Sequence, residues 1–563
     1  MFLPTTRAEM EEHGWDACDI VIITPDAYVD HPSFAMAILG RFLEKHGYRV
    51  GIISQPHWKS PDEFLSLGVP KICFAVSGGN IDSMVLNYTS SGKPRKTDQY
   101  CEAGNPWFSS KGDAKKYRIR PDRVVTVYSN QIRAACKGVP LIIGGVEASL
   151  RRIAHYDWWS DKVKRSVLFD AKADILIYGM GEYPLLEVVR KLEKGIQPDE
   201  MEVPGTAVIR KTLEGLSDPL ILPSFEEVKK DKKAFAEAFC EFSSNSDCRV
   251  LAQQQDTRFL VQFPRREITE QELDAIYETD FERRPHPAFR DIPAFTMIRD
   301  SITSHRGCYG NCSFCSIAAH QGRTIISRSR KSILREARAV VSAQGFHGTI
   351  TDVGGPSANM YASCCKIGGC DDPDCLNKGK NGGACSNLKT DLREYLGLLQ
   401  DVQELPGVKH VFVNSGLRYD HVLMNEAFLR EMLHHHISGQ MKVAPESGSE
   451  RVLSLMNKPD THEFASFKAL FEKIKKEDGI RNYVIPYIIV GHPGEGEKET
   501  KETLEFLRRH DLRGHQFQIF TPTPLTLSTA IYYLGFHPST GKPLETEKKL
   551  RVLEKRKETL IGN

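Results

Sequence analysis

Short apolar runs alternate with amphipathic segments along two stretches of the chain, and this alternation is the feature that most constrains the fold. In the first stretch, residues 19–24 (DIVIIT) have the length of a buried strand, and residues 34–46 follow with apolar side chains at helical spacing. Further strand-like runs span residues 49–54, 71–77, 141–145 and 174–179. Strands that alternate with helices predict a parallel sheet. We therefore expect an α/β chain with an N-terminal doubly wound parallel-sheet (Rossmann-like) domain.

The second stretch repeats this alternation with a longer period. Its strand-like runs span residues 297–303, 348–353, 409–414, 440–444, 481–490 and 516–520, with helical patterns between them. Six strand–helix repeats are fewer than the eight of an ordinary closed barrel, so we expect a partial (βα)6 barrel. The ligand site of such a barrel is expected at the carboxyl ends of its strands.

Residues 200–290 interrupt the alternation and separate the two stretches. A hairpin is predicted over residues 249–262, and Thr269 with Glu272 forms a capping-box pattern that begins a helix. We therefore expect an N-terminal domain over residues 1–292, a barrel domain over residues 293–540 and a charged C-terminal helix or tail over residues 541–563.

Composition narrows the cellular setting of the chain. Its 563 residues are 40% hydrophobic and carry a formal net charge of +2, so the general basic excess of many nucleic-acid-binding proteins is absent. No apolar run approaches the roughly 18 residues that span a bilayer. Fourteen cysteines without a secretion signal favour reduced thiols and metal ligation. We therefore expect a cytoplasmic protein with no membrane partner.

The stretch of residues 304–315 (SHRGCYGNCSFC) places Cys308, Cys312 and Cys315 in one short glycine-containing loop. Three thiolates can hold three irons of a [4Fe–4S] cluster and leave the fourth iron open to a substrate. One alternative is a structural zinc site with His305 or His320 as the fourth ligand. Another is a set of buried thiols that pack as small hydrophobic groups.

The same loop, with the aromatic Phe314 before its last cysteine, resembles the signature of the radical S-adenosylmethionine (SAM) superfamily. The whole chain is similar to the YgiQ family within it, from residues 19–58 through residues 442–459. The resemblance implies a partial (βα)6 barrel, an iron–sulfur cluster on the three cysteines, and SAM bound at the open iron. It also implies that one electron, from a donor such as flavodoxin or ferredoxin, cleaves SAM to a 5′-deoxyadenosyl radical that abstracts hydrogen from a substrate.

Two further segments match places where superfamily members contact SAM. Gly354 and Gly355 follow the second strand-like run of the barrel, and the resemblance implies that their backbone receives the amino group of SAM. Pro356 stands where many members have an acidic residue. A tight turn is the structural alternative.

Residues 444–453 (APESGSERVL) resemble the corresponding segment of radical methylthiotransferases. The resemblance implies that Glu446 and Ser447 face the ribose or carboxylate of SAM, and it gives some support to methyl or methylthio transfer. A helix N-terminus capped by Ser447 or Ser449 explains the same residues.

Glycine-rich loops follow several strands of the N-terminal domain, at residues 77–80, 144–147 and 179–182. Ligands bind at the carboxyl ends of such strands, and the pattern resembles cobalamin-binding domains. The Asp-x-His-x-x-Gly motif of a lower cobalt ligand is absent, since Asp30 and His31 have the wrong spacing. We therefore favour loops that serve substrate binding or packing over cobalamin.

A cysteine-rich insertion spans residues 361–387. It contains Cys364, Cys365, Cys370, Cys375 and Cys385. A polar loop has little apolar surface to bury five thiols, so zinc or a second cluster is favoured over a reduced loop without metal.

Two functions of different classes follow from these observations. The first is a radical SAM enzyme with a [4Fe–4S] cluster and a substrate that the sequence does not identify. The second is a zinc-stabilised RNA-binding module without catalytic activity, in which basic loops contact the RNA.

Overall fold

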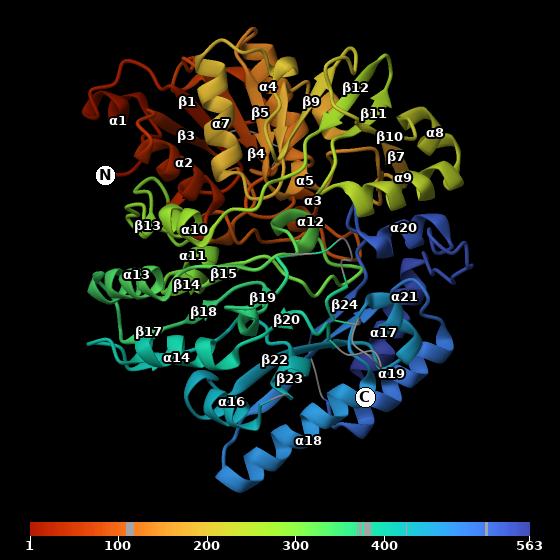
Figure 1. Ribbon diagram of the computed structural model, residues 1–563. Coiled ribbons are helices and arrows are strands. Elements are labelled where there is room, and N and C mark those ends of the chain that lie inside the picture. The colour runs from red at the N-terminus through yellow and green to blue at the C-terminus, as the bar shows by residue number, and fades with distance from the viewer. Residues whose placement is uncertain are drawn as a thin grey trace. The chain divides into compact units, whose positions relative to one another are not determined.

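The computed structural model describes residues 1–108, 117–368, 370, 374–376, 384–423, 425–512 and 516–562, and the chain divides into two compact units (Figure 1). The first unit comprises Met1–Glu267 and Thr279–Arg299, and the second comprises Ile268–Glu278 and Asp300–Asn563. Helices and strands alternate in both units. The predicted α/β class is confirmed.

The first unit is built on a nine-stranded sheet with the order β10-β11-β12-β9-β8-β5-β4-β1-β3. Its five-stranded parallel core has the order β3-β1-β4-β5-β8. These strands are β1 (Ile20–Thr24), β3 (Val50–Ser54), β4 (Cys73–Ser77), β5 (Leu141–Gly144) and β8 (Ile175–Ile177). Almost every side chain of the five is buried, as expected for a parallel sheet covered on both faces.

Helices cover both faces of this parallel core. Helix α2 (Ala35–Lys45) packs against α7 (Glu182–Glu193), whereas α4 (Val124–Ala135) lies against β4 and β5 (Figure 1). The crossovers from β1 to β3 and from β4 to β5 run in opposite directions across the sheet. Because such crossovers are right-handed, they place α2 and α4 on opposite faces, which is the predicted doubly wound arrangement.

Four more strands extend the sheet beyond β8. Strand β9 (Thr206–Arg210) is antiparallel to β8 and to β12 (Arg258–Gln262). Strand β12 forms the predicted hairpin with β11 (Leu251–Gln255), and β10 (Leu220–Leu222) is the edge strand. The segment that interrupts the alternation in the sequence thus continues the same sheet.

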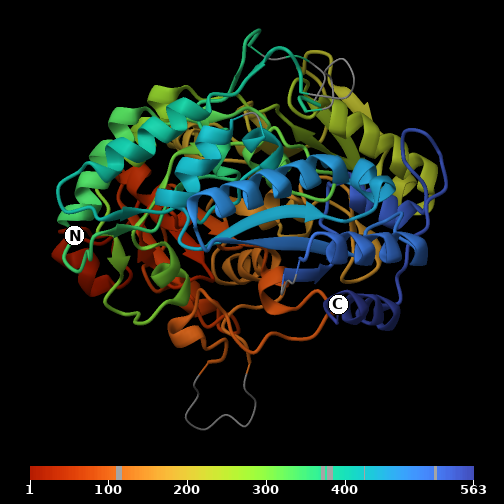
Figure 2. The same ribbon diagram turned by 90° about the horizontal axis from the view of Figure 1, so that it is seen from below.

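The second unit contains three groups of parallel strands. Strand β14 (Ser301–Thr303) pairs with β18 (Asp352–Gly354), and β17 (Thr349–Ile350) pairs with β21 (His410–Val411). The third group contains β22 (Gln440–Glu446), β23 (Tyr483–Val490) and β24 (Gln516–Ile519), which lie side by side as blue arrows in Figure 2. Closure of the groups into one partial (βα)6 barrel stays a prediction.

The strand predicted over residues 297–303 is wrong in its first half. Residues Pro293–Ile298 form helix α11, and only Ser301–Thr303 are extended, as β14. Proline at the first helical position has the φ angle that a helix needs, and its missing N–H has no partner to lose there. The apolar character of Met297 and Ile298 alone does not distinguish a helix from a strand.

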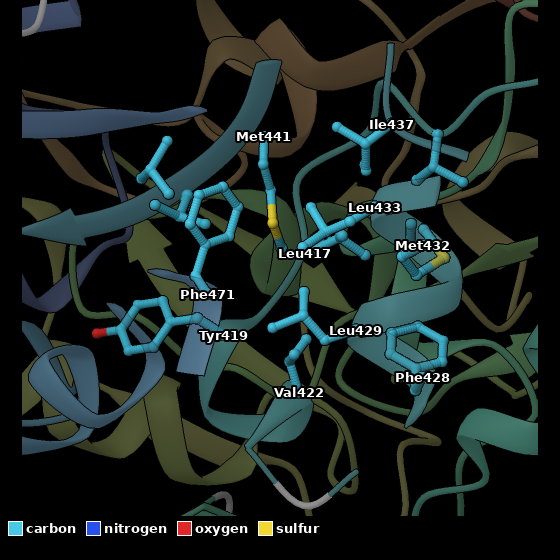
Figure 3. Packing of buried hydrophobic residues seen from close by; sticks show 14 of the residues in the cluster. Leu417, Tyr419, Val422, Phe428, Leu429, Met432, Leu433, Ile437, Met441 and Phe471 are labelled. Carbon is cyan, nitrogen blue, oxygen red and sulfur yellow. The ribbon is translucent and has the colours of Figure 1, made fainter. Parts of the chain in front are cut away.

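One hydrophobic core holds the second unit together (Figure 3). Its members include Met441 of β22, Leu429 of helix α16 (Glu426–Glu431) and Phe471 of helix α18 (Thr461–Asp478), and all three side chains are fully buried. Truncation of such a residue to alanine typically costs about 2–5 kcal/mol. The core therefore fixes the strands whose carboxyl ends carry the candidate site.

Within the described ranges, no helix combines the length and the apolar character needed to cross a membrane.

Candidate functional site

The cysteine loop, residues 304–315, is positioned by two short strands and a glycine. Strand β15 (His305–Arg306) pairs with β16 (Ile326–Ser327), and the amide of Cys308 donates to the carbonyl of Gly322 at 3.0 Å. Gly307 has a φ of +87°, and a Cβ atom there would lie 1.9 Å from the carbonyl oxygen of Thr324. Only glycine fits this position, so the loop must turn sharply just before its first cysteine.

The three candidate iron ligands lie close together on this loop. A Cβ atom built on Gly310 would lie 3.3 Å from Sγ of Cys308 and 3.9 Å from Sγ of Cys312. Burial and, after it, the neighbouring charges of Cys312, Cys308 and Glu446 raise the pKa of Cys315 to about 12. Thiols in such a place stay protonated unless a cation compensates them, which suits a site for iron.

Arg418 provides positive charge beside the same thiols. It is almost completely buried, its Nη2 donates to Oδ2 of Asp420 at 2.7 Å, and its Nη1 would lie 2.8 Å from a Cβ on Gly310. Burial favours the protonated form of Asp420. The charge and hydrogen bonds of Arg418, together with the charges of His421 and Lys458, outweigh burial and lower the pKa of Asp420 to about 2. This ion pair was not identified from the sequence, because neither residue belongs to a recognisable motif.

The glycine turn, formed by Gly354 and Gly355, starts beside the cysteine loop. Parallel pairing of β14 and β18 places Thr303 opposite Gly354, and the amide of Ser304 donates to the carbonyl of Gly354 at 2.8 Å. A Cβ atom on Gly355 would lie 2.6 Å from Cε1 of the buried His305 ring. The structure therefore brings Gly354 and Gly355 to the beginning of the loop that carries the cysteines.

Glu446 is the last residue of strand β22 and Ser447 follows it. Their side chains make different contacts. Glu446 is buried with a φ of +67°, and its carboxylate lies 3.8 Å from Nζ of Lys458. Burial raises the pKa of Glu446, and Lys458 opposes the shift. A non-glycine residue in this conformation is strained, and such strain is common at functional sites.

The hydroxyl of Ser447 is already used within the protein. It lies 3.2 Å from Oγ1 of Thr503 and accepts from the amide of Ser449 at 3.2 Å. Glu446, in contrast, acts on the cysteine loop, because its negative charge raises the pKa of Cys315.

A second contact that the sequence did not reveal fixes the middle of the cysteine loop. Oγ of Ser313 lies 2.8 Å from Oγ of Ser528, whose amide donates to the carbonyl of Ser313 at 2.9 Å. Nε2 of His492 lies 2.6 Å from the same Ser528 hydroxyl, and all three side chains are buried. The segment between Cys312 and Cys315 is thus attached to the start of helix α20 (Leu527–Leu534), and through Ser528 to the turn that follows β23.

The cysteine-rich insertion lies only partly within the described residues, since residues 369, 371–373 and 377–383 fall outside them. Strands β19 (Cys364–Cys365) and β20 (Leu388–Lys389) close its base, and the amide of Cys385 donates to the carbonyl of Cys375 at 2.8 Å. Cys375 also packs in a small apolar cluster with Cys308.

Over the described parts of the chain, no three His, Cys, Asp or Glu side chains form a ready metal-binding group. Ligation at the insertion and at Cys308, Cys312 and Cys315 therefore stays a prediction.

Comparison with known families agrees with the division of the chain. A family described as radical SAM N-terminal matches residues 2–301, and the radical SAM superfamily matches residues 302–507. A UPF0313 protein of Methanocella arvoryzae is 45% identical over 555 residues, which cover 97% of this chain and 90% of the relative. A UPF0313 protein of Thermotoga neapolitana is 43% identical over 579 residues, which cover 100% of this chain and 98% of the relative.

Solved structures show a similar fold at low sequence identity. TsrM from Kitasatospora setae, a radical SAM methyltransferase with cobalamin and a [4Fe–4S] cluster bound, matches with a TM-score of 0.53 and 15% identity. The match covers 92% of this chain and 74% of TsrM. A second TsrM structure, with tryptophan and a SAM analogue bound, matches with a TM-score of 0.51.

The family matches together span most of the chain, and the curated relatives align with it over nearly their whole length. This result favours an enzyme over a zinc-stabilised binding module. The chain belongs to the UPF0313 (YgiQ) family of the radical SAM superfamily and is a radical SAM enzyme.

Proposed function

We propose that this enzyme holds a [4Fe–4S] cluster on Cys308, Cys312 and Cys315 and binds SAM between that loop, the turn at Gly354 and Gly355, and the end of β22 at Glu446 and Ser447. The observation that carries the proposal is the hydrogen bond from Ser304 to Gly354. It joins the beginning of the cysteine loop to the beginning of the glycine turn. Two segments that the superfamily uses for one cofactor pair are therefore neighbours in this chain.

The cluster, once reduced by a donor such as ferredoxin or flavodoxin, would supply one electron that cleaves SAM to methionine and a 5′-deoxyadenosyl radical. The radical then takes a hydrogen atom from a C–H bond of the substrate. The products of that step are 5′-deoxyadenosine and a substrate radical.

The protein's own groups prepare the site for a cationic ligand. The Glu446 carboxylate can accept hydrogen bonds from the ammonium or the ribose hydroxyls of SAM. Arg418 offsets the negative charge of the cysteine thiolates. The hydroxyl of Ser447 supports the turn through Thr503 rather than through the ligand.

Group transfer is the second candidate, as a refinement of the same chemistry. Two observations favour it: the similarity of residues 444–453 to radical methylthiotransferases, and the fold shared with a methyltransferase. Transfer of methyl or methylthio would give S-adenosylhomocysteine or a methylthiolated product besides 5′-deoxyadenosine. Product analysis by mass spectrometry distinguishes the two candidates.

Anaerobic reconstitution tests the proposal. The protein should take up four irons per chain and show the EPR signal of a reduced [4Fe–4S] cluster, and it should release 5′-deoxyadenosine from SAM. The triple variant Cys308→Ala, Cys312→Ala and Cys315→Ala should lose all three properties. Cys248→Ser is the matched control, because Cys248 is exposed and lies in the first unit. Zinc without iron at the three thiols would refute the proposal.

Glu446→Gln tests the SAM contact separately from the cluster. We expect SAM to bind about tenfold more weakly, as loss of roughly 1.4 kcal/mol implies, with iron content unchanged. Ser447→Ala should leave the SAM affinity nearly unchanged, because its hydroxyl contacts Thr503 and Ser449. Equal SAM affinity in Glu446→Gln and the unaltered protein would contradict the assignment.

A further inference from the structure

The parallel core of the first unit has one place where a large cofactor is expected. The chain runs from β1 to its neighbour β3 on one side and from β4 to its neighbour β5 on the other side. The direction of the connections across the sheet therefore reverses between β1 and β4. In open α/β sheets a crevice opens outside the carboxyl ends of the strands at this reversal, and ligands bind there. A cobalamin carried by this unit would be expected in that crevice.

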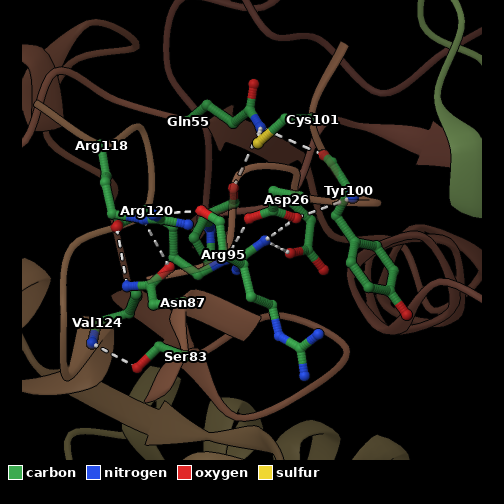
Figure 4. Close-up of polar contacts among 12 residues, drawn as sticks. Asp26, Gln55, Ser83, Asn87, Arg95, Tyr100, Cys101, Arg118, Arg120 and Val124 are labelled. Carbon is green, nitrogen blue, oxygen red and sulfur yellow. Dashed lines mark hydrogen bonds and ion pairs between the residues drawn. The ribbon is translucent and has the colours of Figure 1, made fainter. Parts of the chain in front are cut away.

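The connection between β4 and α4, residues 78–123, is far longer than the few residues typical of such loops. Its described part returns to the carboxyl ends of β1 and β3. The amide of Ala27, just after β1, donates to the carbonyl of Tyr100 at 2.9 Å. Nε2 of Gln55, just after β3, lies 3.2 Å from Sγ of Cys101 (Figure 4). The connection therefore lies against both strand ends next to the reversal.

A buried ion-pair cluster joins the connection to β1. Arg120 is 1% exposed, and its guanidinium lies 2.9 Å from a carboxylate oxygen of Asp26 (Figure 4). It also lies 2.9 Å from a carboxylate oxygen of Asp98. Asp26 also accepts from the amide of Asn80 at 2.8 Å. Three charged groups without access to water are stable only as a set, so this arrangement is not easily exchanged for a ligand.

The glycines at the strand ends are explained by the protein's own side chains. A Cβ atom on Gly79 would lie 2.5 Å from the Asp26 carboxylate, and one on Gly78 would lie 2.7 Å from Cβ of Glu147. The close approach that glycine permits in these loops is therefore already used within the chain.

A second set of buried polar contacts lies at the neighbouring end of β5. Glu147 accepts from the amide of Ser83 at 3.1 Å and from the amide of Val125 at 3.0 Å. Asp82 forms an ion pair with Arg151, and both are buried. The start of the connection, at residues 82–83, and the first turn of α4, at Val125, are thus fixed to the segment that follows β5.

We propose that the described part of the connection between β4 and α4, residues 78–108 and 117–123, permanently occupies the crevice at the β1/β4 reversal, and that this enzyme works without cobalamin. The proposal rests on the proposed function, because it concerns how the SAM-derived radical is used. With no corrin to carry a group, the C–H bond of the substrate is the direct partner of the radical. The shared fold with TsrM then does not extend to its cobalamin.

The test uses the full chain after anaerobic reconstitution of the cluster. The protein is incubated with excess hydroxocobalamin, desalted and examined for the corrin absorbance, with a cobalamin-dependent radical SAM methyltransferase as the positive control. We expect no retained corrin and the same rate of 5′-deoxyadenosine formation with and without it. One equivalent of retained corrin, or a rate that depends on it, would overturn the inference.

Hydrogen exchange gives a second readout that needs no activity. The amide of Ala27, which donates to Tyr100, should exchange equally slowly with and without hydroxocobalamin. A changed exchange rate at Ala27 on addition of the corrin, faster through loss of the bond to Tyr100 or slower through cover by the corrin, would show that the crevice admits it. Either result is separate from a failure of the proposed function, which would appear as a missing cluster EPR signal.

Discussion

Replacement of Arg120 by methionine isolates the energy of the buried ion-pair cluster in the first unit. Two contacts of 2.9 Å, at an effective dielectric constant of about 20, give roughly 6 kcal/mol of attraction each. Desolvation of the guanidinium and repulsion between Asp26 and Asp98 offset much of this sum. Removal of one partner from a buried cluster typically costs about 3–5 kcal/mol, and we expect a loss of that size.

The pH dependence of the Arg120→Met variant gives a second check on the same reasoning. Burial raises the pKa of Asp26 in the folded protein, whereas Arg120 lowers it, so the substitution raises it further. A carboxyl whose folded pKa exceeds its unfolded value stabilises the fold at low pH and loses that contribution as the pH rises. The deficit of the variant should therefore shrink on acidification.

Thermal and urea unfolding followed by circular dichroism measure both effects. Arg249→Met is the matched control, because Arg249 forms an exposed pair with Asp218 at 2.9 Å that should be worth about 0–1 kcal/mol. A loss for Arg120→Met no larger than that of Arg249→Met would refute the assignment of a closed, water-free cluster. So would a deficit that grows on acidification.

Three further substitutions test the second unit. Gly307→Ala places a Cβ atom 1.9 Å from the Thr324 carbonyl and should abolish cluster assembly, measured as iron content. Gly439→Ala is the control and should retain iron, because Gly439 also has a positive φ, +108°, but has open space around it. Ser528→Ala removes the contact to Ser313 and should speed iron loss to a chelator several-fold, with the exposed Ser539→Ala as control, and equal rates would contradict this role. Burial raises the pKa of Glu495 to about 7, so stability should fall as the pH rises through about 7, by up to about 3 kcal/mol between about pH 5 and about pH 9. Glu495→Gln should remove this slope in urea unfolding, and an unchanged slope would assign it to another group.

Local pattern was sufficient to predict most elements of both units. The prediction of a strand over residues 49–54 matches β3 within one residue, because a continuous apolar run bounded by polar residues has few other solutions. The pattern was insufficient where pairing decides the structure. The strand predicted over residues 348–353 is two pieces, β17 and β18, which pair with different neighbours.

The candidate site shows the same division between local and distant information. The cysteine spacing and the glycine turn were readable because each lies within a few residues. The contact of Ser313 with Ser528 joins positions 215 residues apart, and one sequence holds no record of it. The glycines before Asn80 have the same pattern whether a cofactor or the Asp26 carboxylate lies against them, so only the structure shows which it is.

The sequence separation within the buried cluster also affects synthesis of the protein. Asp26 precedes Arg120 by 94 positions. At a translation rate of about 5–20 residues per second, Arg120 is therefore synthesised about 5–20 s after Asp26. During that interval β1 can pair with β3, but its carboxyl end stays hydrated. We expect nascent chains arrested before Arg120 to be readily digested by proteases, and chains released after Arg299 to resist them.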